Sequence, residues 1–305
     1  MADTTRIGFV GLGHMGGNMA ARFLDAGYPV YGTERNRVRA RGLMHDDLQW
    51  CTSSREVAEV ADVIFTSLPD DAALEEVASG DEGILAGLSP AGSSVGKIWV
   101  DMSTVSPRAS REVAARAHAR GAAMLDAPVS GSVPQVNAGT LTIMAGGEER
   151  AYARVEPLLR ILGTPTRIGE NGQGLVLKLA INISLAVQML AFAEGLLLAT
   201  HAGIDRELAV DVMTSSPIGS PMLKARAALV LDLPDEAWFD VGLMQKDIVL
   251  ALDAARDLRV PLPSTAAADE ALTVARALGY EHRDLAALFE VLGRMAGEAV
   301  DAGRH

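Results

Sequence analysis

The sequence is poor in cysteine and in positive charge. Its 305 residues include one cysteine, Cys51, so an internal disulfide is excluded and no cluster of thiolates is present to bind zinc. A single thiol fits a reducing compartment. The 27 basic residues face 39 acidic ones, which leaves a net charge of −12. Such a field repels phosphate backbones and anionic lipid, so nucleic acid and membrane surfaces are poor candidate partners.

Long uninterrupted hydrophobic runs are also missing. The first apolar run, Ile7–Val10, is far shorter than the hydrophobic region of a secretory signal. The segment Leu175–Ala199 is apolar, but four polar residues that are costly in hydrocarbon interrupt it: Lys178, Asn182, Gln188 and Glu194. We therefore interpret this segment as a buried helix of a soluble protein, and we expect the protein to be cytoplasmic.

What the first 165 or so residues do contain is an alternation of strand-like and helical patterns. This order builds a parallel sheet with helices on both faces. The predicted strands are Arg6–Val10, Pro29–Thr33, Val63–Ser67, Ile98–Asp101, Ala123–Pro128 and Leu141–Ala145. The predicted helices are Gly17–Ala26, Arg37–Leu43, Asp71–Ala78 and Pro107–Arg120.

After Gly163–Pro165 the strand-like runs end and helical periodicity continues to His305. We therefore predict two domains, a dinucleotide-binding domain over residues 1–168 and an all-helical domain over residues 169–305. The second begins with a helix that reaches about Thr200, roughly 40 Å long at 1.5 Å per residue, which would link the two domains. Because this helix is apolar around most of its circumference, it needs cover on several sides, and a partner subunit would supply it.

A glycine-rich turn follows the first predicted strand and opens a helix. It reads Gly11-Leu12-Gly13-His14-Met15-Gly16. In this context the first glycine permits a tight turn, the second lets the backbone approach a pyrophosphate, and the third allows the helix to pack closely on the strand. The helix N-terminus directs N–H groups at the anion. The turn predicts a dinucleotide cofactor, with a turn that serves packing alone as the alternative.

The second predicted strand ends at Glu34 and Arg35. An acidic residue here hydrogen-bonds the ribose of NAD and repels the additional phosphate of NADP, whereas a guanidinium can pair with that phosphate. Glu34 thus favours NAD and Arg35 favours NADP. We predict NAD, and NADP stays open as the alternative.

Three further stretches have unusual residues for their predicted positions. Residues 126–132 lie at a strand end. Their hydroxyl groups, and the backbone N–H groups that the glycine leaves accessible, could bind a carboxylate there. Lys178 and Asn182 lie four residues apart, and therefore on one face of the long helix. Lys246 and Asp247 open an otherwise apolar helical stretch. By itself Lys178 would be typical of a snorkelling or ion-paired structural residue, and the Lys246-Asp247 pair would be typical of a solvated helix face.

Taken together, these motifs resemble those of the β-hydroxyacid dehydrogenase family, which includes 3-hydroxyisobutyrate dehydrogenase, tartronate semialdehyde reductase and, more distantly, 6-phosphogluconate dehydrogenase. The resemblance runs over nearly the whole chain and also includes the stretch 101–104. It implies an α/β Rossmann fold with a doubly wound parallel sheet, a long interdomain helix and an all-α C-terminal domain. It further implies a homodimer or homotetramer that acts on a small carboxylate.

The resemblance also implies roles for individual residues. It makes Lys178 the catalytic acid/base, Ser130 and Gly131 binders of the substrate carboxylate, and Asn182 an orienting residue. The cofactor contacts that it implies, besides the glycine turn, are Leu68, Pro69, Thr104 and Lys246. No metal is implied.

Two positions depart from the family pattern. The chain has Ser132-Val-Pro134-Gln135 where relatives have a second glycine and small residues, and Ile181 where they often have an asparagine. We include Ser132 among the substrate-binding candidates. Because both departures fall where the substrate is expected, they bear on which hydroxy acid is used.

The chemistry can be argued independently. Oxidation of an alcohol requires a hydride acceptor and a base for the hydroxyl proton, and a lysine becomes a base near neutral pH when burial or a nearby cation disfavours its charged form. We therefore predict an NAD(P)-dependent dehydrogenase or reductase of β-hydroxy acids or their aldehyde or keto forms. The alternatives are an imine reductase, whose members usually carry aspartate or tyrosine in place of Lys178, and a non-catalytic NAD(P)-binding protein.

Overall fold

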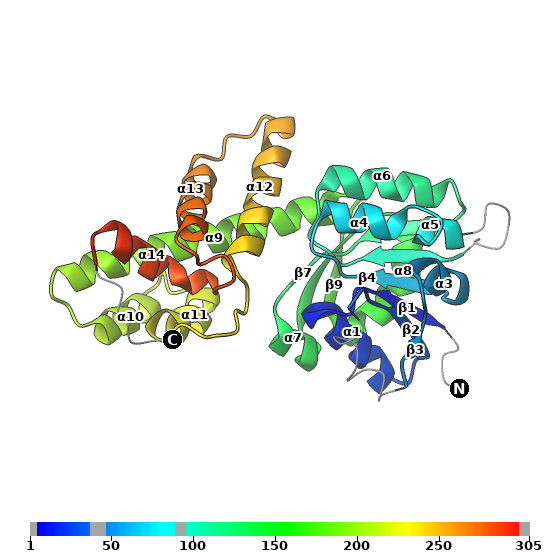
Figure 1. The fold of residues 1–305 in the computed structure, drawn as a ribbon, viewed down its shortest axis with the longest axis horizontal. Coiled ribbons are helices and arrows are strands. Elements are labelled where there is room, and N and C mark those ends of the chain that lie inside the picture. Colours follow the sequence, from blue (N-terminus) through cyan, green and yellow to red (C-terminus); the bar gives the residue numbers. More distant parts are fainter. Residues whose placement is uncertain (1–4, 37–46, 89–95, 299–305) are drawn as a thin grey trace. The chain divides into compact units, whose positions relative to one another are not determined.

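The computed structural model describes residues 5–36, 47–88 and 96–298. The chain divides into two compact units, Met1–Lys178 and Leu179–His305. The first unit holds the sheet and the second is helical (Figure 1). The predicted helix Arg37–Leu43 lies outside the described residues.

The sheet of the first unit has the strand order β3-β2-β1-β4-β5-β6-β8-β7, with β9 paired to β8. The strands are β1 (Ile7–Val10), β2 (Val30–Thr33), β3 (Gln49–Trp50), β4 (Val63–Thr66), β5 (Ile98–Asp101), β6 (Ala123–Asp126), β7 (Val129–Ser130), β8 (Leu141–Gly146) and β9 (Gly163–Gly169). All six predicted strands are present. The sheet is mainly parallel, as predicted, but β8 pairs antiparallel with β6 and β7.

From the sequence we predicted that strand structure ends by Pro165. This prediction is wrong, because one more strand is present. Strand β9 continues to Gly169 and runs parallel to β8. The segment 163–169 contains proline and two glycines, which are typical of turns, so its local preference did not indicate a strand. Pairing with β8 supplies the stabilisation that the local sequence lacks.

Helices cover both faces of this sheet, as Figure 1 shows. They are α1 (His14–Asp25), α3 (Ser54–Val60), α4 (Asp71–Ala78), α5 (Ile84–Gly87), α6 (Pro107–His118), α7 (Val133–Ala138) and α8 (Glu149–Leu162). Successive residues of β4 point to opposite faces: Phe65 joins one core cluster and Ile64 the other. Because both faces are buried, the central strands are apolar throughout, which is the pattern expected of a doubly wound sheet.

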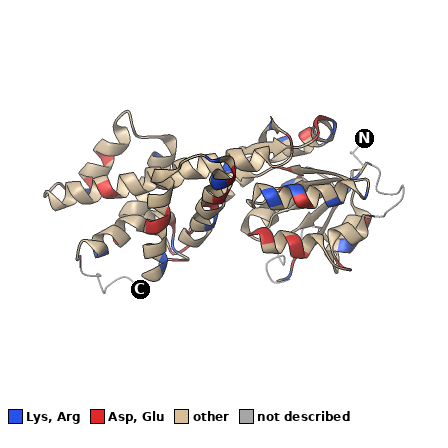
Figure 2. Cartoon of the chain, turned by 90° about the horizontal axis from the view of Figure 1, so that it is seen from above, with Lys and Arg blue, Asp and Glu red and all other residues tan. Residues whose placement is uncertain are grey.

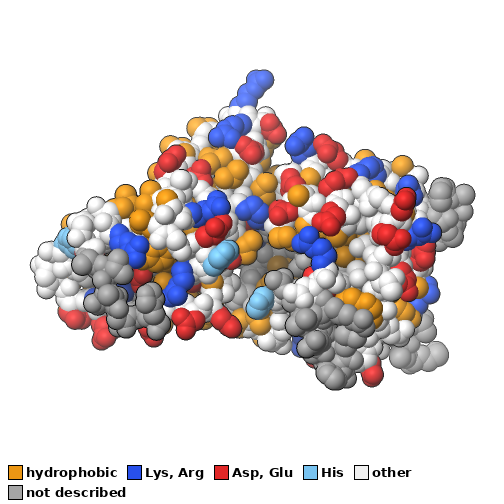
Figure 3. All heavy atoms as spheres, in the orientation of Figure 1, with side chains coloured by type: hydrophobic (Ala, Val, Ile, Leu, Met, Phe, Trp, Pro, Cys, Tyr) orange, Lys and Arg blue, Asp and Glu red, His pale blue; other side chains and the backbone are white. Residues whose placement is uncertain are grey.

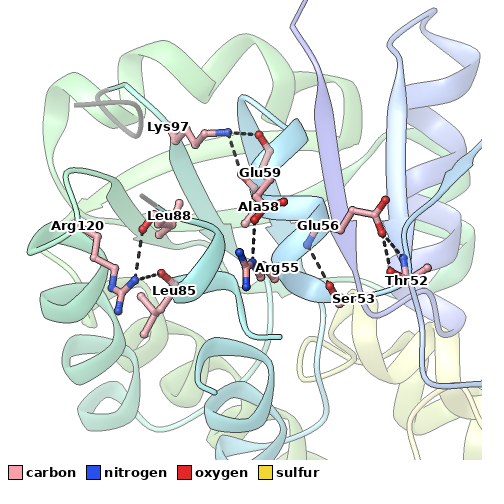
Figure 4. A network of polar contacts seen from close by, with 10 residues as sticks. All are labelled: Thr52, Ser53, Arg55, Glu56, Ala58, Glu59, Leu85, Leu88, Lys97 and Arg120. Atoms are coloured by element: carbon pink, nitrogen blue, oxygen red, sulfur yellow. Dashed lines mark hydrogen bonds and ion pairs between the residues drawn. The ribbon is translucent and has the colours of Figure 1, made fainter. Parts of the chain in front are cut away.

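Helix α3 was not predicted, and side chains fix both of its ends (Figure 4). At its N-terminus the Ser53 hydroxyl accepts a hydrogen bond from the Glu56 N–H. At its C-terminus the Lys97 ammonium donates to the carbonyls of Ala58, Glu59 and Ala61 at 2.6 to 3.0 Å. Burial lowers the pKa of Lys97. These contacts stabilise a helix that is too short to form alone.

The second unit consists of helices around one apolar core. Helix α9 (Gln173–His201) begins in the first unit, and the others are α10 (Arg206–Ser215), α11 (Pro221–Leu231), α12 (Val241–Leu258), α13 (Pro263–Ala277) and α14 (Leu288–Met295). Acidic and basic residues are interspersed along the helices of each unit (Figure 2). At the centre of the second unit, the buried Arg226 guanidinium donates to the Asp284 carboxylate at 2.7 Å.

Helix α9 matches the predicted long helix in position and length, with 29 residues. It is long and apolar enough to cross a membrane by length and composition alone. However, Leu175 packs in a core of the first unit, whereas Met189 and Phe192 pack in the core of the second. We conclude that α9 is a core helix.

Candidate functional site

The glycine-rich turn joins β1 to α1 at the carboxyl end of the parallel strands. Gly11 has φ +90°, a conformation that favours glycine, and a Cβ there would lie 2.3 Å from the Ser67 carbonyl oxygen. A Cβ on Gly16 would lie 1.9 Å from the Gly11 carbonyl oxygen. A Cβ on Gly13, in contrast, would meet no atom within 4 Å. The turn therefore packs tightly beneath α1 and is open at Gly13, which leaves room for a phosphate at the helix N-terminus.

Glu34 reaches this turn from the end of β2. Its carboxylate accepts a hydrogen bond of 2.7 Å from the Leu12 N–H and one of 3.3 Å from the Asn36 N–H. Arg35 points elsewhere, because its guanidinium lies 3.3 Å from the exposed Glu76 carboxylate on α4. The structure thus brings Glu34, but not Arg35, to the glycine-rich turn.

The loops that follow β4 and β5 are joined to each other. The Leu68 N–H donates to the Ser103 hydroxyl at 2.8 Å, and the Ser106 N–H donates to the Asp71 carboxylate at 2.7 Å. Leu68 and Thr104, two of the predicted cofactor contacts, are thereby carried by loops that are held together. Pro69, the third, is exposed next to Leu68.

The predicted carboxylate-binding residues lie between β7 and α7. Ser130 ends β7, and Gly131 has φ +133°, again a conformation that favours glycine. The backbone N–H and the hydroxyl of Ser132 both donate to the Gln135 side-chain oxygen at 2.9 Å. This contact explains Gln135, which departs from the family pattern: it fixes the start of α7. The Ser132 hydroxyl is therefore engaged locally, and the Gln135 side chain also packs against Gly131, where an added Cβ would lie 2.9 Å from Gln135 Cβ.

Asp126, the last residue of β6, holds the start of α9. Its carboxylate accepts hydrogen bonds from the N–H groups of Gly172 at 2.6 Å and Leu175 at 2.9 Å. Asp126 is completely buried. Burial raises the pKa of its carboxyl to about 6, against the lowering effect of these two N–H donors.

Lys178 is buried although it lies beside exposed apolar residues. It is 9% exposed, whereas the neighbouring Val176 and Leu177 are 37% and 38% exposed. A snorkelling lysine would show the reverse arrangement, with its amine in solvent.

In the second unit, a buried carboxylate links two of the predicted site residues. The Asn182 side-chain amide donates to Asp247 Oδ2 at 2.5 Å, and the Lys246 ammonium lies 2.9 Å from Asp247 Oδ1. Asp247 is 2% exposed. The Lys246-Asp247 pair was recognisable in the sequence, but no role was predicted for the aspartate.

Asp101, Asp126 and Asp247 lie in motifs recognised in the sequence, but no role was predicted for any of them. All three are buried, and each binds groups next to predicted site residues. Their positions at strand ends and inside an apolar helical stretch were visible in the sequence. Their hydrogen-bond partners, which lie 2 to 65 residues away in the chain, could not be identified from the sequence. Within the described ranges, no group of three or more His, Cys, Asp or Glu side chains is arranged to hold a metal ion.

Two family models match the chain. Residues 6–172 match the family model described as the NAD binding domain of 6-phosphogluconate dehydrogenase. Residues 172–292 match the model described as the NAD-binding domain of NADP-dependent 3-hydroxyisobutyrate dehydrogenase.

Similar proteins cover almost the whole chain. The chain is 34% identical to 2-(hydroxymethyl)glutarate dehydrogenase of Eubacterium barkeri, with 100% of each chain covered. It is 35% identical to 2-hydroxy-3-oxopropionate reductase of Escherichia coli (strain K12), over 95% of this chain and 98% of the relative. Among solved structures, 3-hydroxyisobutyrate dehydrogenase from Salmonella typhimurium is similar with a TM-score of 0.84 and 31% identity, covering 94% of this chain and 99% of the other.

Proposed function

Because the chain belongs to the β-hydroxyacid dehydrogenase family and is an NAD(P)-dependent oxidoreductase acting on a CH–OH group, we propose that Lys178 is its general acid/base. The observation that carries this role is the burial of Lys178 beside more exposed apolar neighbours. In oxidation the neutral amine takes the proton of the substrate hydroxyl. In reduction the ammonium returns a proton to the carbonyl oxygen.

The proposed substrate is a small β-hydroxy acid of the 3-hydroxyisobutyrate type, or its aldehyde or keto form. The similar proteins are named for such compounds, which supports this substrate class. In the proposal Ser130 and Gly131 bind the carboxylate, with Ser132 at the edge of the same turn, and Asn182 orients the reacting group. The Asp247 carboxylate binds the amide nitrogen of Asn182 and thereby directs its oxygen away from Asp247.

The dinucleotide supplies the hydride acceptor or donor when bound. The residues present fit this group, since the turn is open at Gly13 and packed at Gly11 and Gly16. We propose that Leu12, His14 and Met15 of the turn contact the cofactor, together with Glu34. Further proposed contacts are Leu68, Pro69, Thr104 and Lys246. NAD is the proposed preference, because Glu34 lies at the turn and Arg35 pairs with Glu76.

We further propose a homodimer or homotetramer in the cytoplasm. Large apolar side chains are exposed on the helical unit, among them Leu198 at 75%, Leu208 at 57% and Val212 at 58%. In the view of Figure 3, hydrophobic side chains lie between charged ones on this unit. A partner subunit would cover such residues.

The proposed domain limits are 1–168 for dinucleotide binding and 169–305 for the helical domain with its linking helix.

A spectrophotometric screen at 340 nm tests the proposed function. About twenty hydroxy acids and semialdehydes are assayed with NAD(H) and with NADP(H).

The Lys178→Ala variant should lose hydride transfer by at least about 10²-fold while it still binds NADH, because removal of a general acid/base leaves cofactor contacts in place. Full activity of this variant would contradict the role of Lys178. Turnover of cyclic imines without hydroxy acids would instead indicate an imine reductase. Tight NADH binding without any turnover would indicate a non-catalytic protein.

A further inference from the structure

Three buried polar residues end three adjacent strands of the first unit. Thr66 ends β4, Asp101 ends β5 and Asp126 ends β6, and the strand register pairs Thr66 with Asp101 and Asp101 with Asp126. Each is completely buried. We name these three residues the edge row. Burial of a carboxylate costs free energy unless hydrogen bonds compensate for the lost contact with water. The hydrogen-bond partners of Asp101 and Asp126 therefore indicate what each carboxylate holds in place.

Asp101 binds the hydroxyls that connect two loops. Its Oδ1 accepts hydrogen bonds from the Thr66 hydroxyl at 2.7 Å and from the Ser103 hydroxyl at 2.6 Å. The Thr66 hydroxyl also accepts from the Trp99 ring N–H at 2.9 Å, so its single proton is directed to Asp101. The Ser103 hydroxyl in turn accepts from the Leu68 N–H. One carboxylate thus sets the positions of the loops after β4 and β5.

Asp126 binds the start of α9 in a similar way. It accepts from the N–H groups of Gly172 and Leu175, and Lys178 lies one helical turn after Leu175. The helix approaches the sheet too closely for any side chain at Gly174: a Cβ there would lie 2.2 Å from the Met144 carbonyl oxygen and 2.9 Å from Asp126 Oδ2. The first turn of α9 is therefore fixed to the ends of the strands.

We propose that Asp101 and Asp126 are positioning residues with separate tasks. Asp101, through Ser103 and Thr66, holds the loops that carry Leu68 and Thr104 and so determines cofactor affinity. Asp126 holds the helix that carries Lys178 and so determines the rate of proton and hydride transfer. This inference rests on the proposed function, because it assigns Lys178 and the two loops their roles. Neither aspartate needs to touch substrate or cofactor.

The test compares single variants in two measurements on the full chain, NADH affinity without substrate and kcat at saturating cofactor. Ser103→Ala and Thr66→Val remove the hydroxyls that Asp101 binds. We expect each to raise the Kd for NADH about tenfold, the effect of one buried hydrogen bond, while kcat falls less than about threefold.

Asp126→Asn keeps the size of the side chain but can accept only one of the two N–H groups. We expect kcat to fall about 10- to 100-fold, as displacement of a catalytic group does, with the Kd for NADH within about twofold.

Two conservative variants and one control separate positioning from simple loss of stability. Thr66→Ser retains the hydroxyl and should restore the wild-type Kd for NADH. Asp126→Glu retains both acceptors but displaces them, and it should lower kcat alone, which keeps the test valid where Asp126→Asn does not fold. Ser53→Ala removes the helix cap of α3, a contact with the Glu56 N–H that involves no residue of the edge row. It should lower the melting temperature without changing either Kd or kcat.

The outcomes are distinguishable. Equal changes of Kd and kcat in the Ser103 and Asp126 variants, or no change in either, would overturn the division of tasks. Failure of the proposed function would be seen separately, as retained hydride transfer in Lys178→Ala. The Kd for NADH in Ser103→Ala and Thr66→Val is measured without turnover, so this half of the inference is decided even in that case.

Discussion

The side-chain amide of Asn182 donates a hydrogen bond of 2.5 Å to the carboxylate of Asp247, 65 residues later in the chain. Asp247 is 2% exposed and also faces the ammonium of Lys246. An amide that donates to a fixed carboxylate has a defined orientation, because its nitrogen must point to the acceptor. The same carboxylate therefore orients a proposed substrate residue and a proposed cofactor residue.

Loss of this carboxylate should impair catalysis more than folding. We expect Asp247→Ala to lower kcat/KM by about 10- to 100-fold, the equivalent of a charge-assisted hydrogen bond of about 1.5 to 3 kcal/mol. Asp247→Asn should have a smaller effect, since its carbonyl still accepts from Asn182. Asp253→Ala is the matched control on α12, because Asp253 is exposed and forms an ion pair with Arg256, one turn later on the same helix. Equal losses in the Asp247 and Asp253 variants, measured by steady-state kinetics, would contradict the role.

Two glycines of the phosphate-binding turn should respond differently to the same substitution. A Cβ on Gly16 would lie 1.9 Å from the Gly11 carbonyl oxygen, so Gly16→Ala should destabilise the protein by about 1 to 3 kcal/mol or more. A Cβ on Gly13 would meet no protein atom within 4 Å, so Gly13→Ala should fold normally. It should nevertheless weaken NADH binding at least about tenfold, because the methyl group occupies the space of the pyrophosphate. Urea unfolding and fluorescence titration with NADH measure the two effects. Normal NADH affinity of Gly13→Ala would place the cofactor elsewhere.

Cofactor preference should depend on Glu34. We expect the protein to prefer NAD, and Glu34→Ala to reduce the ratio of kcat/KM for NAD to that for NADP by about 10- to 100-fold, since the carboxylate no longer repels the additional phosphate. Glu76→Gln provides a contrast: it releases Arg35 from an exposed ion pair and should change this ratio less than about threefold. A wild-type preference for NADP that persists in Glu34→Ala would refute this assignment.

The buried Asp126 should make stability depend on pH. Burial raises its pKa to about 6 in the folded protein, above the ordinary value of 3.8. The folded state therefore binds the proton more tightly than the unfolded chain, and this contribution to stability is present at low pH and is lost as the pH rises through about 6. Between pH 5 and pH 7.5 the loss from this group is about 1 kcal/mol.

Asp126→Asn, which cannot titrate, is the variant that isolates this effect. We expect the free energy of unfolding of the wild type, relative to that of the variant, to be about 1 kcal/mol higher at pH 5 than at pH 7.5. Urea unfolding at the two pH values measures it. A difference between the two proteins that does not change with pH would show that the Asp126 carboxyl titrates outside this range.

Much of the fold could be predicted from local sequence. The apolar runs that became β1, β4 and β5 are buried on both sides, so hydrophobicity alone marked them. The glycine turn was recognisable because its spacing reflects tight packing at Gly11 and Gly16. Several elements of the first unit were not predicted: helices α3, α5, α7 and α8 and strands β3, β7 and β9. Helix α3 depends on Lys97 from another part of the chain, and β9 depends on pairing with β8. Local propensity does not record such distant partners.

The sequence by itself determined the six predicted strands and their alternation with helices, the glycine-rich turn and the candidacy of Lys178 and Asn182, because periodicity, glycine spacing and polar residues within apolar runs are local properties. Only the tertiary structure decided which carboxylates hold these groups. Asp101, Asp126 and Asp247 acquire their partners when separate strands and helices come together. The physical reason is that a hydrogen bond requires two groups within about 3 Å in a suitable direction, and the sequence does not specify that distance for residues far apart in the chain.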